Sequence, residues 1–259
     1  MRSERNAELA RRCDLLRSLH VPGSPLVLPN AWDVASARAV VAAGFPVVAT
    51  TSGGVAAALG YEDHEGAPAD EMLAAGERIS RNVDVPVTID AEAGYGLGPS
   101  ELVAALERAG AAGCNVEDTD HAAGALRDPT QHAAWLRSVR EADEVGLVIN
   151  ARIDVFLSAD GGTPQKELVP EALERAHAYF EAGADCVYPI LLSEPEALFA
   201  FIPEAGGPVN VLAGDRAPSL GELAELGVAR ISYGTILHRR VMEELASSLA
   251  SIAAEAAPP

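Results

Sequence analysis

The chain has little positive charge, few cysteines and no long apolar run. Its 259 residues include 19 Lys and Arg against 38 Asp and Glu, a formal net charge of −19. Binding to nucleic acid without sequence preference needs clustered cations that neutralise phosphates, so the composition argues against it. Cys13, Cys114 and Cys186 show no CxxC or Cys/His spacing. Neither a disulfide framework nor a zinc site is expected.

The sequence also lacks targeting and membrane signals. No run of roughly 18 apolar residues is present to span a bilayer. The segment from Met1 to Leu19 is rich in Arg and Glu, where a secretory signal would carry an apolar core. Apolar residues make up 49% of the chain, which is ample for a buried core. We therefore expect a globular cytoplasmic protein that binds neither nucleic acid nor membrane.

The most informative pattern is an alternation of short β-branched runs with longer segments of helical spacing. The predicted strands are Pro25–Pro29, Pro46–Thr50, Pro86–Asp90, Gly113–Asp118, Leu147–Arg152, Ala184–Ile190, Pro208–Ala213 and Val228–Tyr233. The predicted crossover helices include Ala31–Ala43, Pro99–Ala111, Pro170–Ala182 and Leu220–Leu226. Several helices are expected to end at an Ala-Gly or Leu-Gly step, at Gly44, Gly113, Gly183 and Gly227.

Strict β-α alternation implies parallel strands, arranged as a closed barrel or as an open doubly wound sheet. Eight units favour the barrel, and no GxGxxG motif opens a helix as in a dinucleotide-binding sheet. The fold class predicted is therefore α/β, a single (β/α)₈ barrel spanning residues 1–259. Two long loops, Thr51 to about Pro68 and Thr119 to about Gln131, follow the second and fourth strands and could close over a ligand.

Carboxylates gather at the ends of two neighbouring predicted strands. Asp90 and Glu92 follow the third strand, and Glu117 and Asp118 end the fourth. Like charges at about 4 Å repel by several kcal/mol at an effective dielectric near 20, and a hard divalent cation removes that repulsion. Mg²⁺ suits oxygen ligands and needs only one or two carboxylates. If the strand continues past Asp90, its side chain and that of Glu92 share one face. The alternative is that these residues cap helices or face solvent.

These motifs resemble the isocitrate lyase/phosphoenolpyruvate mutase superfamily. The carboxylate segment continues as Gly94-Tyr95-Gly96, and the similarity extends over most of the chain. It includes Leu28–Asp33, Thr51–Gly54, Leu59–Asp63 and Asn150–Asp154.

The resemblance implies a barrel whose last helix is exchanged between subunits of a homodimer or homotetramer. It also implies a small carboxylate substrate and Mg²⁺, with Mn²⁺ as a substitute. Asp90 would be the principal metal ligand, with Glu92 and Glu117 holding metal-bound waters. Ser52, Gly53 and Gly54 match a Ser-Gly turn that receives substrate oxygens.

Four further residues are candidate catalytic groups. Arg152 matches an arginine that neutralises substrate carboxylate or enolate charge, and a guanidinium pairs bidentately with carboxylates. The alternative for Arg152 is an internal salt bridge to Glu117 or Asp154. Asp63 matches an acidic residue of the family in the loop after the second strand. The alternative is that Asp63 lies in a solvent-exposed turn.

Tyr95 could place its hydroxyl near the metal. The alternative is that its ring packs under a loop. His121 lies in the loop where a catalytic acid or base is expected. The alternative is an ordinary surface histidine without a catalytic role.

Departures from the family motifs leave the reaction open. Isocitrate and methylisocitrate lyases carry a Lys-Lys/Arg-Cys-Gly-His segment in the loop after the fourth strand, and the corresponding segment here, from Asp120 to Leu126, contains no cysteine and no lysine. The mutase's loop Lys and Asn are also missing, and Ile190 stands where its strand-six His is expected.

The leading hypothesis is a Mg²⁺-dependent lyase that cleaves a C–C bond in a small 2-hydroxy or 2-oxo (di)carboxylate through a metal-stabilised enolate. Oxaloacetate hydrolysis or decarboxylation, or phosphonate P–C chemistry, at the same site is the second hypothesis. A catalytically inactive metal-binding barrel is the third.

Overall fold

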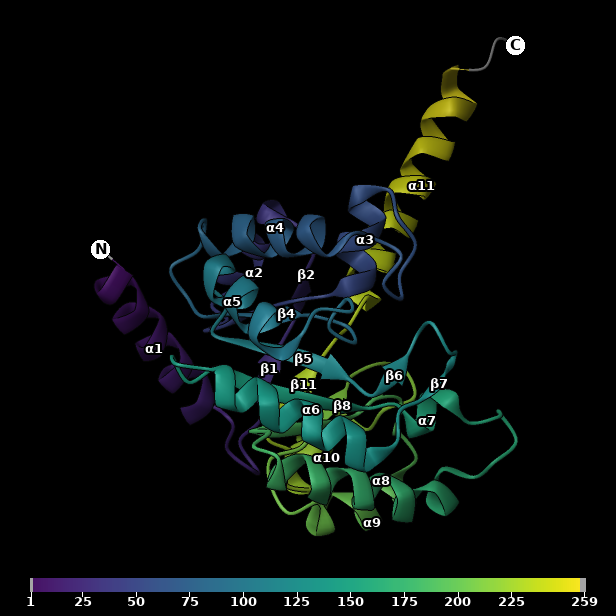
Figure 1. The fold of residues 1–259 in the computed structure, drawn as a ribbon. Coiled ribbons are helices and arrows are strands. Elements are labelled where there is room, and N and C mark those ends of the chain that lie inside the picture. The colour runs from purple at the N-terminus through teal and green to yellow at the C-terminus, as the bar shows by residue number, and fades with distance from the viewer. Residues whose placement is uncertain (1, 257–259) are drawn as a thin grey trace.

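Parallel strands surround a central core and helices cover the outside (Figure 1). The computed structural model describes residues 2–256. The strands that form the barrel are β1 (Leu26–Leu28), β2 (Asn30–Ala31), β3 (Val48–Thr50), β4 (Val87–Asp90), β5 (Gly113–Glu117), β8 (Val148–Ile153), β9 (Cys186–Pro189), β10 (Asn210–Leu212) and β11 (Arg230–Ser232). Each predicted strand is present. Strand β1 lies within the first of them, Pro25–Pro29, and β2 follows it at Asn30–Ala31, so the predicted helix Ala31–Ala43 begins later, at Val34.

The strands form a ring rather than an open sheet. Hydrogen-bonded neighbours run in the order β2-β3-β4-β5-β8-β9 and, separately, β1-β11-β10. A parallel bridge between Val187 and Val209 joins the two sets, and the Val187 amide donates to the Pro208 carbonyl at 3.0 Å. On the other side only Pro29, which has no N–H, separates β1 from β2. The first strand therefore changes partner there, from β11 to β3. The predicted barrel is confirmed.

The helices of the outer layer follow the strands as the sequence pattern indicates. They are α2 (Val34–Ala42), α3 (Ser52–Leu59), α4 (Ala69–Ser80), α5 (Pro99–Ala109), α6 (Pro129–Ala142), α7 (Val155–Ser158), α8 (Gln165–Glu181), α9 (Pro195–Phe201), the short 3₁₀ helix η1 (Ile202–Glu204) and α10 (Leu220–Glu225).

Glycines close several of these helices, because they adopt the left-handed conformation at no steric cost. Gly44, Gly183 and Gly227 have φ of 90°, 100° and 87°, as predicted. The prediction at Gly113 is wrong. Gly110, with φ of 73°, closes α5 instead. Gly113 lies in β5, where an added Cβ would lie 2.6 Å from the Val148 carbonyl oxygen of the neighbouring strand.

The helices at the two ends of the chain differ in their contacts. Helix α1 (Arg2–Ser18) covers the end of the barrel where the strands begin, with Leu16 buried and Arg17 bonded to Asp185 at 2.8 Å. Helix α11 (Ile236–Ala256) projects away from the barrel (Figure 1) and has no buried residue. Its exposed large apolar residues are Val241, Met242, Leu245, Leu249 and Ile252. Within residues 2–256, no helix combines the length and apolarity needed to cross a membrane.

Both segments expected to be long loops contain regular structure. The first includes α3, which begins at Ser52 although Gly53 and Gly54 are poor helix formers. It forms because Val55 and Ala56 are buried, a tertiary gain that local propensity does not report. The second contains the antiparallel hairpin of β6 (Thr119–Asp120) and β7 (Ala125–Leu126).

Candidate active site

Asp90 ends β4 at the carboxyl edge of the barrel and has one carboxylate oxygen without a partner. Its Oδ2 accepts from the Ser52 amide at 3.0 Å, and its own amide donates to Thr50 Oγ1 at 2.9 Å. The other oxygen, Oδ1, is buried and has no hydrogen-bond partner among the described residues. A buried acceptor left unpaired costs about 1–3 kcal/mol, and more when it is charged. This oxygen is therefore suited to accept a cation or a donor from a bound molecule.

Glu92 reaches the same region by a turn and not by continuing the strand. Its φ of 46° is left-handed and β4 ends at Asp90, so the strand does not continue far enough for Asp90 and Glu92 to share a strand face. The Glu117 amide donates to the Glu92 carbonyl at 2.9 Å, and the Glu65 amide donates to the Glu92 carboxylate. Burial raises the pKa of Glu92 to about 8, and nearby carboxylates including Asp90 add to the rise.

Arg152 is held between two buried carboxylates. It donates through Nε and Nη2 to both oxygens of Asp154, at 2.6 and 2.7 Å, and its Nη1 lies 2.5 Å from Glu117. The internal salt bridge considered as the alternative is thus present, to both expected partners. A guanidinium has five N–H donors, and these three contacts leave two for a ligand.

Glu117 also contacts His121, whose Nε2 lies 2.5 Å from Glu117 Oε1. Burial raises the pKa of Glu117 to about 7, although Arg152 and His121 oppose the rise. The same hydrogen bond raises the pKa of His121 above its ordinary value. His121 is therefore a partner of a buried carboxylate, although it is partly exposed.

The start of α3 brings together Ser52, Gly53 and Asp63. The Ser52 amide is already bonded to Asp90, so it is not free for a substrate oxygen as the motif implied. A Cβ on Gly53 would lie 2.6 Å from Asp63 Oδ2, so glycine allows the Asp63 carboxylate to approach the helix. Gly54 has a packing role, because its Cβ would lie 3.0 Å from Trp32 Cβ.

Tyr95 packs its ring against the core and contacts Asp90 only weakly. Its φ is 54°, its ring lies against the cluster that includes Val55 and Ala56, and its hydroxyl is 3.4 Å from the Asp90 carbonyl oxygen. Burial raises the pKa of its hydroxyl well above 10. This arrangement agrees with the packing alternative.

A cavity of about 250 Å³ lies at the carboxyl ends of the strands. The predicted residues among its lining are Ser52, Asp63, Asp90 and Arg152, whereas the other predicted site residues are not part of the lining. Sequence reasoning missed several polar lining residues: Asn30, Asn115, Tyr188, Ser232, Tyr233, Thr235 and Arg239. A signal was present for Asn115 and Ser232, because polar residues alternate with apolar ones in Asn115–Glu117 and Arg230–Ser232.

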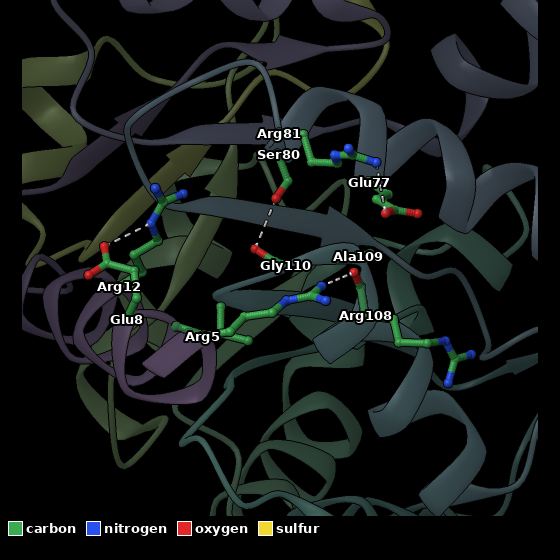
Figure 2. Close-up of a pocket in the computed structure, with 10 residues that line it drawn as sticks. Arg5, Glu8, Arg12, Glu77, Ser80, Arg81, Arg108, Ala109 and Gly110 are labelled. Atoms are coloured by element: carbon green, nitrogen blue, oxygen red, sulfur yellow. Dashed lines mark hydrogen bonds and ion pairs between the residues drawn. The ribbon is translucent and has the colours of Figure 1, made fainter. Parts of the chain in front are cut away.

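A larger cavity, of about 510 Å³, lies at the opposite end of the barrel (Figure 2). Its lining includes Ser80 and Gly110, which precede β4 and β5, so it faces the amino ends of the strands. Two of its arginines form ion pairs within the chain: Arg12 with Glu8 at 3.4 Å and Arg81 with Glu77 at 3.5 Å. Barrel enzymes place their chemistry at the carboxyl ends, so the smaller cavity is the candidate active site.

A closed parallel barrel with carboxylates and an arginine at the carboxyl ends of its strands is the arrangement of a barrel enzyme that acts on a small anionic substrate. The chain belongs to the phosphoenolpyruvate phosphomutase family, whose model matches residues 16–253. This match confirms the resemblance drawn from the sequence and the expected class, an enzyme of the phosphoenolpyruvate mutase/isocitrate lyase superfamily.

Three similar proteins illustrate the range of the family. A crystal structure from Burkholderia cenocepacia, provisionally described as a phosphonomutase, has 42% identity and a TM-score of 0.87, and the match covers 92% of this chain and 99% of that one. An uncharacterized Mycobacterium tuberculosis protein is 34% identical over 84% of this chain and 81% of its own. A probable 2-methylisocitrate lyase of Corynebacterium glutamicum is 30% identical over 87% and 76%.

Proposed function

We propose that the protein is a Mg²⁺-dependent lyase of the cytoplasm that cleaves a C–C bond in a small 2-hydroxy or 2-oxo (di)carboxylate. The observation that carries the proposal is the buried, unpartnered Oδ1 of Asp90, in a cavity that Arg152 also lines. Relatives named as lyases support the bond type.

The carboxylates around the cavity fit a hard divalent cation. Within the described residues, no three Asp, Glu, His or Cys side chains come close enough to hold a metal by themselves. Mg²⁺ commonly binds through one or two carboxylates, with water and substrate completing its shell. Asp90 would be the direct ligand, and Glu92 and Glu117 would bind metal-bound waters. Bound there, Mg²⁺ would supply Lewis-acid polarisation of substrate oxygens. Mn²⁺ is the expected substitute.

The side chains of the cavity have separate roles in this proposal. Arg152, fixed by Asp154 and Glu117, points its remaining N–H groups at a substrate carboxylate and stabilises enolate charge. Asp63, which lines the cavity, would carry a proton to or from the substrate. His121 and Glu117 form a pair behind Arg152 that keeps the local charge balanced. Tyr95 supports the turn that carries Glu92.

A second reaction class on the same site is favoured by one observation. The similarity at 42% identity to a structure provisionally described as a phosphonomutase supports P–C bond chemistry. Oxaloacetate hydrolysis or decarboxylation would use the same anionic substrate groups. An inactive metal-binding barrel is the remaining alternative, motivated by the missing lysine and cysteine in the hairpin of β6 and β7.

The exposed apolar face of α11 supports the homo-oligomer that the resemblance implies, with α11 packed against another copy of the chain.

A substrate panel separates these reactions. Purified protein with Mg²⁺ is incubated with 2-methylisocitrate-like, malate-like, oxaloacetate and phosphonopyruvate substrates, and pyruvate, glyoxylate, oxalate and phosphate are measured. Pyruvate or glyoxylate release from a 2-hydroxy acid supports the lyase. Release of oxalate or pyruvate from oxaloacetate, or of phosphate together with pyruvate from phosphonopyruvate, supports the second class. Binding of Mg²⁺ and oxalate without any turnover supports the inactive barrel.

A further inference from the structure

The floor of the candidate cavity contains a polar cluster that the proposed function does not use. Asn115 on β5 lines the cavity and is the Cα partner of Asp90 on one side and of Asn150 on the other. Arg230 on β11 lies beneath them and is fully buried. Barrel interiors are usually filled by Val, Ile and Leu, so two asparagines and an arginine in contact inside the barrel are unusual.

Two donors fix the orientation of the Asn115 side chain. Asn150 Nδ2 donates to Asn115 Oδ1 at 2.8 Å, and Arg230 Nη2 donates to the same oxygen at 3.0 Å. A guanidinium is only a donor, so it requires an acceptor opposite it, and rotation of the Asn115 amide would place NH₂ against N–H. The oxygen of Asn115 therefore faces the floor, and its NH₂ group is the end left for the cavity.

The surrounding cluster carries unmet hydrogen-bonding capacity. Arg230 Nη1, Asn150 Oδ1 and Thr88 Oγ1 are buried without partners among the described residues. Among those residues Arg230 also has no carboxylate in ion-pair contact, which makes it an expensive charge to bury. Burying these unpaired polar and charged groups costs folding free energy, and such local costs are typical of residues that bind a ligand.

We propose that Asn115 is a substrate-binding residue, which donates from its side-chain amide to an anionic oxygen of the bound carboxylate. Arg230 and Asn150 are positioning residues that hold the amide in that orientation. The inference rests on the proposed function, because it places the carboxylate beside Asp90. It adds a neutral donor from the floor to the charge supplied by Arg152. The site thus favours a planar anion, whose oxygens meet donors on more than one side.

The test measures oxalate binding by calorimetry in the presence of Mg²⁺, and Mg²⁺ binding alone as a separate titration. Asn115→Leu removes the donor with little change of volume. Asn115→Asp removes it too and gives Arg230 a carboxylate partner, so this variant is expected to fold at least as stably as the parent. Both are expected to weaken oxalate binding about 10- to 100-fold, the loss of one hydrogen bond to a charged group. Affinity for Mg²⁺ alone is expected to change little in Asn115→Leu.

Variants at Arg230 test the positioning role. Arg230→Met removes a buried charge and is expected to fold. It removes one of the two donors that orient the Asn115 amide, so oxalate binding is expected to weaken several-fold. Arg230→Lys retains a donor and is expected to recover most of that loss. Unchanged oxalate binding in both Asn115 variants would overturn the inference, and unchanged binding in Arg230→Met would overturn the positioning role. If the parent protein fails to bind oxalate with Mg²⁺, the proposed function falls and the inference falls with it. Should Asn115→Leu fail to fold, Asn115→Asp decides the outcome.

Discussion

Replacing Glu92 with Gln is expected to remove a pH-dependent loss of stability from the metal-free protein. The Glu92 side chain is buried beside Asp90 and Glu117, and it accepts from the Glu65 amide. Burial raises its pKa from 4.5 to about 8, so the folded chain keeps this proton over a pH range in which the unfolded chain has lost it. The contribution of Glu92 to the free energy of unfolding is therefore fully present below pH 4.5 and is lost as the pH rises to about 8.

The size of the effect follows from the pKa difference. At 1.36 kcal/mol per pH unit, ionising Glu92 in the folded protein costs on the order of 5 kcal/mol by about pH 8. Glu117, with its pKa raised to about 7, adds a loss of the same sign. Gln is neutral at every pH, so Glu92→Gln is expected to show only the pH-dependent loss of stability that is due to Glu117. Bound Mg²⁺ favours the ionised carboxylates, so it is expected to stabilise the parent more at pH 8 than at pH 5.5.

Urea denaturation followed by tryptophan fluorescence, at several pH values between 5 and 8.5 and with and without MgCl₂, measures these differences. Glu196→Gln, which changes an exposed carboxylate, is the matched control and is expected to follow the parent. Parallel stability profiles for the parent and Glu92→Gln would show that Glu92 does not cause the loss of stability, and equal stabilisation by Mg²⁺ at both ends of the range would show that Mg²⁺ binding is not linked to its ionisation.

Three further changes test other parts of the account. Arg152→Met is expected to lower the free energy of unfolding by about 3–5 kcal/mol at pH 8, because it removes the guanidinium that pairs with the buried carboxylates of Glu117 and Asp154. It is also expected to abolish oxalate binding; urea denaturation and calorimetry check the two effects. Gly53→Ala is expected to displace Asp63 and to reduce turnover at least tenfold, which corresponds to about 1.4 kcal/mol of activation free energy. Gly221→Ala, with open space around its Cβ, is the control and is expected to leave turnover unchanged. Leu249→Glu is expected to shift light-scattering mass toward the monomer, and an unchanged mass would count against packing of α11 on another copy.

The order of strands and helices could be predicted from the sequence because it depends on local periodicity. Every predicted strand is present, and the helix-closing glycines are correct except at Gly113. Helix α3 was missed, because its two glycines oppose helix formation and only burial of Val55 and Ala56 compensates.

The candidate site was predicted in part, for a physical reason. Residues at strand ends, such as Asp90 and Arg152, are placed by the strands themselves, and the sequence locates them well. Glu92 depends on a left-handed turn, and the Ser52 amide is occupied by Asp90, so neither position follows from spacing alone. Asn115 was missed because its role depends on Arg230, which lies 115 residues away in the chain.

In the proposed site, Asp90 Oδ1 binds Mg²⁺ beside the substrate. A crystal structure of the protein soaked with MgCl₂ and oxalate tests it most directly. We expect a metal on Asp90 Oδ1, waters between the metal and Glu92 and Glu117, and oxalate within hydrogen-bond distance of Arg152. A cavity without metal or oxalate under those conditions, or a metal bound away from Asp90, would contradict it.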